Sequence, residues 1–192
     1  MKTKHAFYSI VLSLAVSAAN AQTPIPEGYV KATITLANNS ELHGYIKDNM
    51  KKAASVSFLD ESGNNKKNYD GNQINSLTIE GANLICLNGD FFKSVCTGKL
   101  NFLQKLSDAS GKLTYNGSEP IFNNGTEGKI GDYFVYSSTD RKLKLLNKKS
   151  VDAFIANDLT GCTEAIEKAK TINGDIAQLK GAVEIYNSYA SK

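Results

Sequence analysis

The sequence predicts an α+β fold, in which an antiparallel β-meander is followed by two or three C-terminal amphipathic helices. Between residues 29 and 146, apolar and polar residues alternate in short runs separated by turns, a pattern typical of strands in a half-buried sheet. From about residue 147 the apolar period changes from two to nearly four residues, which is typical of helices. We therefore expect a β-rich body over residues 22–147, as a curved sheet or a barrel-like form, and a helical segment over 148–192 that packs on it.

The expected strands follow one another along the body. Each combines β-branched or aromatic residues with alternating polar ones, and Asn-, Gly- or Ser-rich turns separate most of them. Residues 118–132 differ, because they hold three glycines and a proline but few apolar residues, and we expect a loop there. The strand candidates are YVKATITL, ELHGYIKD, ASVSFLD, KKNYD, QINSLTIEG, LICLNGDFFKSVC with its continuation TGKLNFLQKL, GKLTYNG, YFVYS and RKLKLLN.

Three segments after residue 147 place apolar residues on one helical face. The second ends at Asn173-Gly174, a typical helix stop, and the third begins with Asp175 and Gln178 in the spacing of a capping box. Apolar stripes of this kind usually belong to a core, so we expect the helices to pack against the sheet or against each other. The three segments are KKSVDAFIAND, CTEAIEKAKTING and DIAQLKGAVEIYNSY.

The first residues, MKTKHAFYSIVLSLAVSAANAQ, have the order of a secretory signal peptide: lysines, an apolar run and the small-x-small sequence Ala19-Asn20-Ala21. We expect cleavage after Ala21 and a mature protein in the periplasm, at the cell surface or outside the cell. A membrane anchor is the alternative, but the apolar run is shorter than the roughly 20 residues that span a bilayer. We expect no transmembrane segment after signal cleavage, because no second apolar run of spanning length follows.

Several short motifs follow one another along the chain, each occurring once. They are NNSELHGYI in a hairpin, VCTGKLNFL in a long strand, YFVY and LKLL in another hairpin, and DLTGC before a helix that ends in EIYNSY. This succession resembles a group of uncharacterised exported β-rich proteins of Gram-negative bacteria with C-terminal helices. The resemblance covers most of the expected mature chain. It implies no activity, and it supports treating the strands and the terminal helices as one unit.

The charge balance argues against nucleic-acid binding. The formal net charge is +3, but Lys2 and Lys4 belong to the expected signal peptide, so the mature chain is nearly neutral. Arg141 is the only arginine, although arginine is favoured for bidentate phosphate recognition. We expect the lysine pairs at 51/52, 66/67 and 148/149 to lie in solvated turns and at strand edges.

Cys86 and Cys96 raise the question of a disulfide, which an exported chain permits. An Asn88-Gly89 turn of type I′ pairs Leu87 with Asp90 and Cys86 with Phe91, and Cys96 then lies five residues farther along. In a regular hairpin, five residues span roughly 17 Å and put the two thiols on opposite faces, whereas bridged Cα atoms lie within about 7 Å. A bulge or a longer loop would change the parity. The disulfide arrangement therefore stays open, with Cys162 as the first partner to consider in any bridge.

Cys162 and His43 are the candidates for catalysis. Cys162 follows Gly161 at the start of an expected helix, where the positive end of the helix dipole lowers the pKa of a thiol and favours thiolate. His43 is the one histidine beyond the signal peptide, so any base would have to be this strand residue. The alternative for Cys162 is a small packed residue or a disulfide partner. We expect neither a metal nor a cofactor, because C-x-x-C, a histidine pair and a phosphate-binding glycine loop are all absent from the sequence.

Aromatic residues surround the expected loop at 118–132. Tyr115, Phe122, Tyr133 and Tyr136 are candidates for a binding surface that takes a sugar or a peptide. Strand alternation sends Tyr133 and Tyr136 to opposite faces, so about half of the aromatic set must belong to the core.

Three functional hypotheses follow. The leading one is a non-enzymatic binding or structural module of the cell envelope, because the sequence holds a single histidine beyond the signal and no catalytic constellation. The second is a thiol-dependent enzyme that uses Cys162. The third is an envelope assembly partner that acts by strand addition. The partners to consider are an envelope protein, a peptide or a glycan.

Overall fold

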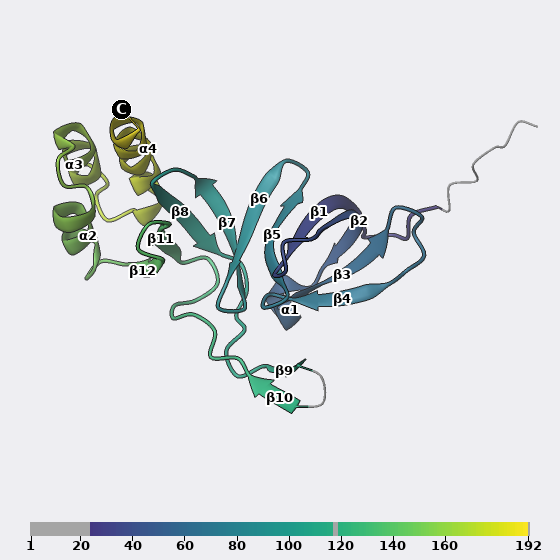
Figure 1. Ribbon diagram of the computed structural model, residues 1–192. Helices are drawn as coiled ribbons and strands as arrows, with labels where there is room; N and C mark the ends of the chain where they lie inside the picture. Colours follow the sequence, from purple (N-terminus) through teal and green to yellow (C-terminus); the bar gives the residue numbers. More distant parts are fainter. Residues whose placement is uncertain (1–23, 117–118, 192) are drawn as a thin grey trace, which may run out of the picture.

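The computed structural model describes residues 24–116 and 119–191 as an α+β fold on a curved, open antiparallel sheet of ten strands (Figure 1). The predicted fold class is confirmed, whereas the expected signal peptide lies outside the described residues. The order across the sheet is β12-β11-β8-β7-β6-β5-β1-β2-β3-β4. The strands are β1 (Val30–Leu36), β2 (Glu41–Asp48), β3 (Ser55–Asp60), β4 (Lys67–Asp70), β5 (Ile74–Ile79), β6 (Ala82–Leu87), β7 (Asp90–Cys96), β8 (Leu100–Lys105), β11 (Tyr133–Ser137) and β12 (Lys142–Leu146).

Strands β1 to β6 form a curled half of the sheet with its own core. Alternation produces this core, because Ala32 and Ile34 of β1 and Ile46 of β2 are buried while their neighbours are more exposed. The short helix α1 (Met50–Ala53) joins β2 to β3 and adds the buried Met50 to the same cluster. The curled half therefore has a core that contains no residue of the terminal helices.

The curl brings the end of β4 back to the turn between β6 and β7. Gly71, just after β4, forms an isolated antiparallel bridge with Gly89 of that turn. A Cβ atom on Gly71 would lie 2.1 Å from the carbonyl oxygen of Gly89, so only glycine permits this approach. The bridge holds one end of the β4 edge, while the sheet as a whole stays open.

The hairpin of β6 and β7 has the predicted turn. Asn88 and Gly89 both have positive φ, 51° and 83°, and the register pairs Leu87 with Asp90 and Cys86 with Phe91. A β-bulge between Ser94 and Cys96 then shifts the register of β7 against β8. The bulge therefore changes the sheet face to which Cys96 points.

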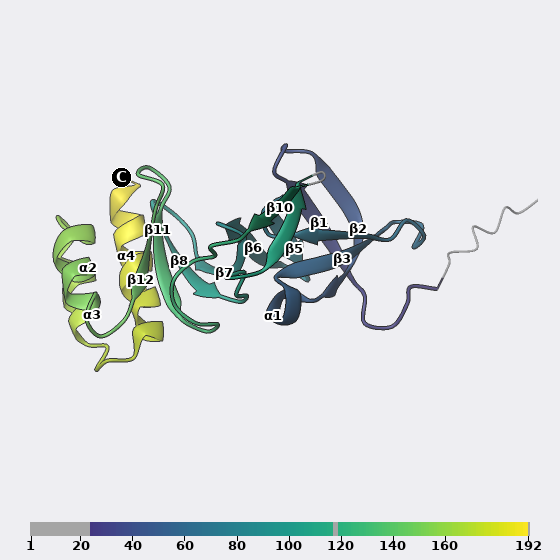
Figure 2. The same cartoon turned by 90° about the horizontal axis from the view of Figure 1, so that it is seen from below.

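Three helices lie beside the second half of the sheet, strands β7, β8, β11 and β12 (Figures 1 and 2). They are α2 (Val151–Asp158), α3 (Thr163–Lys170) and α4 (Leu179–Ala190), with a 3-10 turn, η1 (Ile176–Gln178), before α4. Their buried residues pack on Leu100, Phe102 and Val135. Helix α4 lies against β7 and β8, and α3 packs on α4. Asn187 anchors α4 to β8, because its amide accepts from Leu100 N at 2.9 Å and donates to Leu100 O at 2.8 Å. The predicted helical segment therefore packs on the sheet, and its core is separate from that of the curled half.

The helix signals in the sequence are largely confirmed. Asn173 and Gly174 follow α3 with positive φ, and the predicted stripe of the last segment supplies the buried Leu179, Val183 and Tyr186. Asp175 accepts from Ala177 N at 3.0 Å, so it caps the 3-10 turn rather than α4 itself.

The expected loop at 118–132 is in part a strand. Residues Glu119–Phe122 form β10, which pairs with β9 (Leu113–Asn116) in a two-stranded hairpin that projects from the body (Figure 1). The glycine-rich remainder of the segment is irregular, as predicted. The prediction failed for β10 because its four residues pair with β9 alone, outside the ten-stranded sheet, and the segment EPIF lacks the alternating apolar pattern that locates strands.

Candidate functional site

Cys162 and His43 do not form a catalytic pair. His43 lies on β2, where its ring contacts Thr33 Oγ1 at 3.1 Å and Glu41 at 3.9 Å, and its side chain is 56 % exposed. Cys162 is buried among the helices just before α3, at the opposite end of the molecule (Figure 1). The pairing considered from the sequence is therefore wrong for a single chain.

The other two thiols are packing residues in the structure. Cys86 belongs to the core of the curled half, and burial, with the nearby charges of Asp70 and Asp90, raises its pKa well above the usual range. Burial also raises the pKa of Cys96, which packs against the helical core. Both thiols are held in the protonated, weakly nucleophilic form at neutral pH.

The parity argument for Cys86 and Cys96 is corrected by the bulge in β7. Because of the bulge, Cys96 lies opposite Phe102 of β8. By strand alternation, this pairing places Cys96 on the same face of the sheet as Cys86. The two thiols are instead separated along the strand and lie in different cores. All three cysteines are free thiols in the structure, and Cys162 lies in the same core as Cys96.

The aromatic candidates do not form one surface. Tyr133 stacks on Phe102 on the helix side of the sheet, with centroids 5.1 Å apart, whereas Tyr136 packs with the small core on the other face. Phe122 is 69 % exposed at the end of β10, and the Tyr115 side chain lies outside the described part of the structure. The predicted split of the tyrosines between two faces is confirmed, and a shared binding surface is not assembled by the chain.

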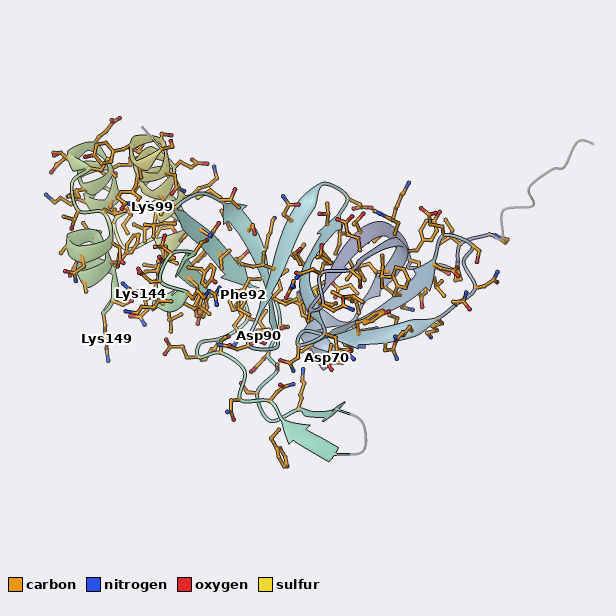
Figure 3. All side chains as sticks on the ribbon, viewed as in Figure 1. Asp70, Asp90, Phe92, Lys99, Lys144 and Lys149 are labelled. Carbon is orange, nitrogen blue, oxygen red and sulfur yellow. The ribbon has the colours of Figure 1, made fainter. Side chains whose placement is uncertain are left out.

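A fully buried ion pair, missed by the sequence analysis, lies where the two halves of the sheet meet. Asp90 of β7 and Lys105 of β8 are both completely buried, with 3.2 Å between Lys105 Nζ and Asp90 Oδ2 (Figure 3 labels Asp90). The Asp90 carboxylate also accepts hydrogen bonds from Ser107 Oγ, Ala109 N, and both N and Oγ1 of Thr126, at 2.7–2.9 Å. Every acceptor position of the carboxylate is thus in use, as a buried charge requires.

Lys105 completes this network with main-chain partners. Its ammonium donates to the carbonyl oxygens of Thr126, Glu127 and Gly128 at 2.7, 3.3 and 3.2 Å. The network therefore ties the segments on both sides of the β9–β10 hairpin to the sheet. Its groups are fully paired and inaccessible, so we interpret it as a structural anchor and not as a ligand site.

Among the described residues, three grooves lie along the helical half, strands β7, β8, β11 and β12 with α2 to α4. Two lie on either side of α4 and share Glu184 and Ser188; one, of about 420 Å³, reaches Cys162, and the other, of about 700 Å³, reaches Cys96. The third, of about 350 Å³, lies between β12 and α2. Strands β7 and β8 beside α4 are paired on both sides, whereas β12 has a free edge, so only the third of these grooves adjoins unpaired strand backbone.

The free edge of β12 directs main-chain groups away from the sheet. Ser150 Oγ donates to the carbonyl of Leu145 at 2.8 Å from beyond β12, so this carbonyl points away from β11. In an antiparallel ladder, alternate residues direct both N–H and C=O to the same side, so Leu143 has the same outward direction as Leu145. The N–H and C=O of Leu143 and the N–H of Leu145 are therefore presented at this edge.

The groove beside this edge is partly apolar. Its walls come from the β12 residues Leu143 to Leu146 and from α2, which contributes Ala153 and the buried Phe154. Lys144 crosses from β12 to α2 and donates to both carboxylate oxygens of Asp158 at 2.6 and 2.8 Å. This ion pair fixes α2 beside the edge and leaves room for a side chain from outside.

Comparisons with known proteins identify no relative, since no family model, curated protein or solved structure matches the chain. Within residues 24–116 and 119–191, no group of three or more His, Cys, Asp or Glu side chains is arranged to hold a metal ion. In the same residues, each helix is too short or too polar to span a bilayer. The candidate site therefore depends on its own geometry.

Proposed function

We propose that this chain is an exported, non-enzymatic binding module that captures an extended segment of an envelope partner by adding it as a strand to β12. The observation that carries the proposal is the outward-directed backbone of Leu143 and Leu145 next to a partly apolar groove. In strand addition, main-chain hydrogen bonds supply affinity and side-chain pockets supply specificity. Both parts are present at this one edge.

The opposite edge of the sheet is less suitable. Strand β4 has four residues, and the bridge between Gly71 and Gly89 occupies its end. Among the described residues, none of the three grooves lies beside β4, whereas the partly apolar one lies between β12 and α2. These features make β4 a poor template for an added strand and favour β12 as the edge that receives a partner.

Two variants at one position test the use of the β12 backbone. Leu143→Pro removes the outward N–H and leaves the β11 ladder intact, since that N–H does not take part in it. Leu143→Ala shortens the same side chain and keeps the N–H, so it is the matched control. Peptides selected from a random library on the wild-type protein provide the ligands.

We expect Leu143→Pro to weaken peptide binding by about tenfold or more relative to Leu143→Ala, because the main-chain bonds of an added strand are lost. Bound peptide should also slow amide hydrogen exchange at Leu143 and Leu145. Equal affinities for the two variants, with exchange unchanged at both amides, would refute strand addition at β12.

A further inference from the structure

We infer that the segment received by β12 is acidic at both ends and apolar in its centre, an inference that depends on the strand addition proposed above. The chain from 141 to 149 reads RKLKLLNKK, with five basic residues and no acidic one. Four of the basic residues lie toward the two ends of the edge, and the leucines lie between them, with Lys144 as the one cation in the centre. The order of basic and apolar residues along the edge therefore predicts the order of acidic and apolar residues in its ligand.

Four of these cations are available to a ligand. Arg141, Lys142, Lys148 and Lys149 are exposed, and none of them forms a salt bridge with another described residue. Figure 3 shows Lys149 extending away from the body near the start of α2. Lys144 is the exception, because Asp158 already holds it.

The carboxylates near the edge offset only part of this charge. Asp158 is paired with Lys144, whereas Asp140, in the turn before β12, accepts a hydrogen bond from the neutral Ser137 Oγ at 3.2 Å and keeps its charge beside Arg141. Glu127 lines the groove, and Asp152 lies in the first turn of α2, so neither belongs to the strand itself. From residue 140 to 149, four cations without a salt bridge therefore outnumber one such carboxylate, Asp140, and the edge keeps a positive net charge.

The centre of the edge is apolar on one face. Leu143 and Leu145 are half-buried and pack against the small core of Phe92, Leu103 and Phe134. Residues directly opposite each other on paired strands lie about 5 Å apart, so apolar residues at the centre of an added strand would extend this core. An acidic residue at either end would face Arg141 and Lys142, or Lys148 and Lys149.

A second copy of this chain is a poor occupant for the same reason. Antiparallel pairing of two β12 edges would bring the basic ends of one copy against the basic residues of the other. Like charges opposite each other on paired strands are destabilising. The lysines thus oppose self-association and, by the same charge, favour an acidic segment.

Synthetic peptides with blocked ends test the inference. The probe is Glu-Glu-Val-Thr-Val-Glu-Glu, and its matched control, Lys-Lys-Val-Thr-Val-Lys-Lys, keeps the apolar centre and reverses the charge. Titration calorimetry gives the affinities, and amide chemical shifts of Leu143 and Leu145 locate the site. We expect the acidic peptide to bind at least about tenfold more tightly than the basic one, and to weaken as NaCl rises from about 50 to about 500 mM.

Charge-reversal variants provide the decisive comparison. Lys142→Glu/Lys149→Glu should weaken the acidic peptide by about tenfold and strengthen the basic one, because the opposed charges are exchanged. Lys51→Glu/Lys52→Glu makes the same change of charge on α1 in the curled half, and it should alter neither affinity at β12 beyond about twofold.

The possible failures separate the two proposals. If both peptides bind with equal affinity and shift Leu143 and Leu145, the charge specificity is wrong and strand addition stands. If neither peptide shifts these amides, or if the acidic peptide perturbs only other surfaces, both proposals are wrong. If the free protein dimerises through β12 in sedimentation equilibrium, the edge belongs to a second copy and the acidic occupant is excluded.

Discussion

The buried ion pair offers the sharpest test of how the two halves of the sheet are held together. Asp90→Asn keeps the shape of the side chain and removes its charge. One amide oxygen can still accept from Ser107 and Ala109, but the new NH₂ group would face Thr126 N–H and the Lys105 ammonium. A buried acceptor is thereby replaced by a donor that points at other donors.

The cost follows from the groups left without partners. An orphaned buried N–H costs about 1–3 kcal/mol, and removal of one partner from a buried ion pair costs about 3–5 kcal/mol in total. Since these costs overlap, we expect Asp90→Asn to lower the free energy of unfolding by about 3–5 kcal/mol. That is a large part of the roughly 5–15 kcal/mol available to a typical domain.

The assay is urea unfolding followed by circular dichroism, with Asp108→Asn as the matched control. Asp108 lies 4.0 Å from the same Lys105 ammonium but is 50 % exposed, so its loss should cost less than about 1 kcal/mol. Addition of Lys105→Met to Asp90→Asn should cost less than the sum of the single changes, because the uncompensated charge is also removed. A cost below about 1 kcal/mol for Asp90→Asn, or additive single changes, would refute the reasoning.

Three further predictions address the glycine bridge, a buried thiol and the groove. Gly71→Ala should destabilise the protein by about 2 kcal/mol or more in urea unfolding, because the new Cβ meets the Gly89 carbonyl, and a neutral effect would contradict the need for glycine. Cys86 should resist alkylation in the folded protein from pH 7 to about pH 10, because burial raises its pKa; labelling at the rate of a free thiol would contradict this. Ala153→Phe fills the β12 groove from an exposed helix position and should weaken peptide binding by about tenfold, whereas Ala156→Phe, which is exposed on α2 and outside the groove lining, should not. Equal affinities for these two variants would show that the groove is unused.

The sequence predicted those features that depend on local patterns. Alternation located the strands, the change of period located the helices, and Asn88-Gly89 set the register of its hairpin. The position of Asp90 in the sequence could also have indicated a buried charge. It lies between that turn and Phe91-Phe92, and a charged side chain that points inward there requires a buried partner. The identity of the partner, Lys105, was not readable, because it depends on the pairing of β7 with β8.

Features that depend on the order of strands in the sheet could not be predicted from the sequence. The bulge in β7 changed the face of Cys96, although nothing in SVC marks an extra residue. The β9–β10 hairpin is an insertion between β8 and β11, two strands that pair across it. Without that pairing, β12 cannot be recognised as an edge, and the candidate site therefore could not be predicted.

Basic residues at a strand edge have two opposite interpretations, and the geometry of β12 distinguishes between them. Lysines commonly protect an edge against unwanted pairing, and this explanation would suffice if the edge were otherwise closed. Here Ser150 occupies only the Leu145 carbonyl, and the groove beside α2 remains open. Protection by like charge excludes basic and self-pairing strands but leaves acidic strands free to bind. If strand addition occurs at β12 as proposed, the same lysines would select acidic strands, and the two peptides of opposite charge measure that selectivity.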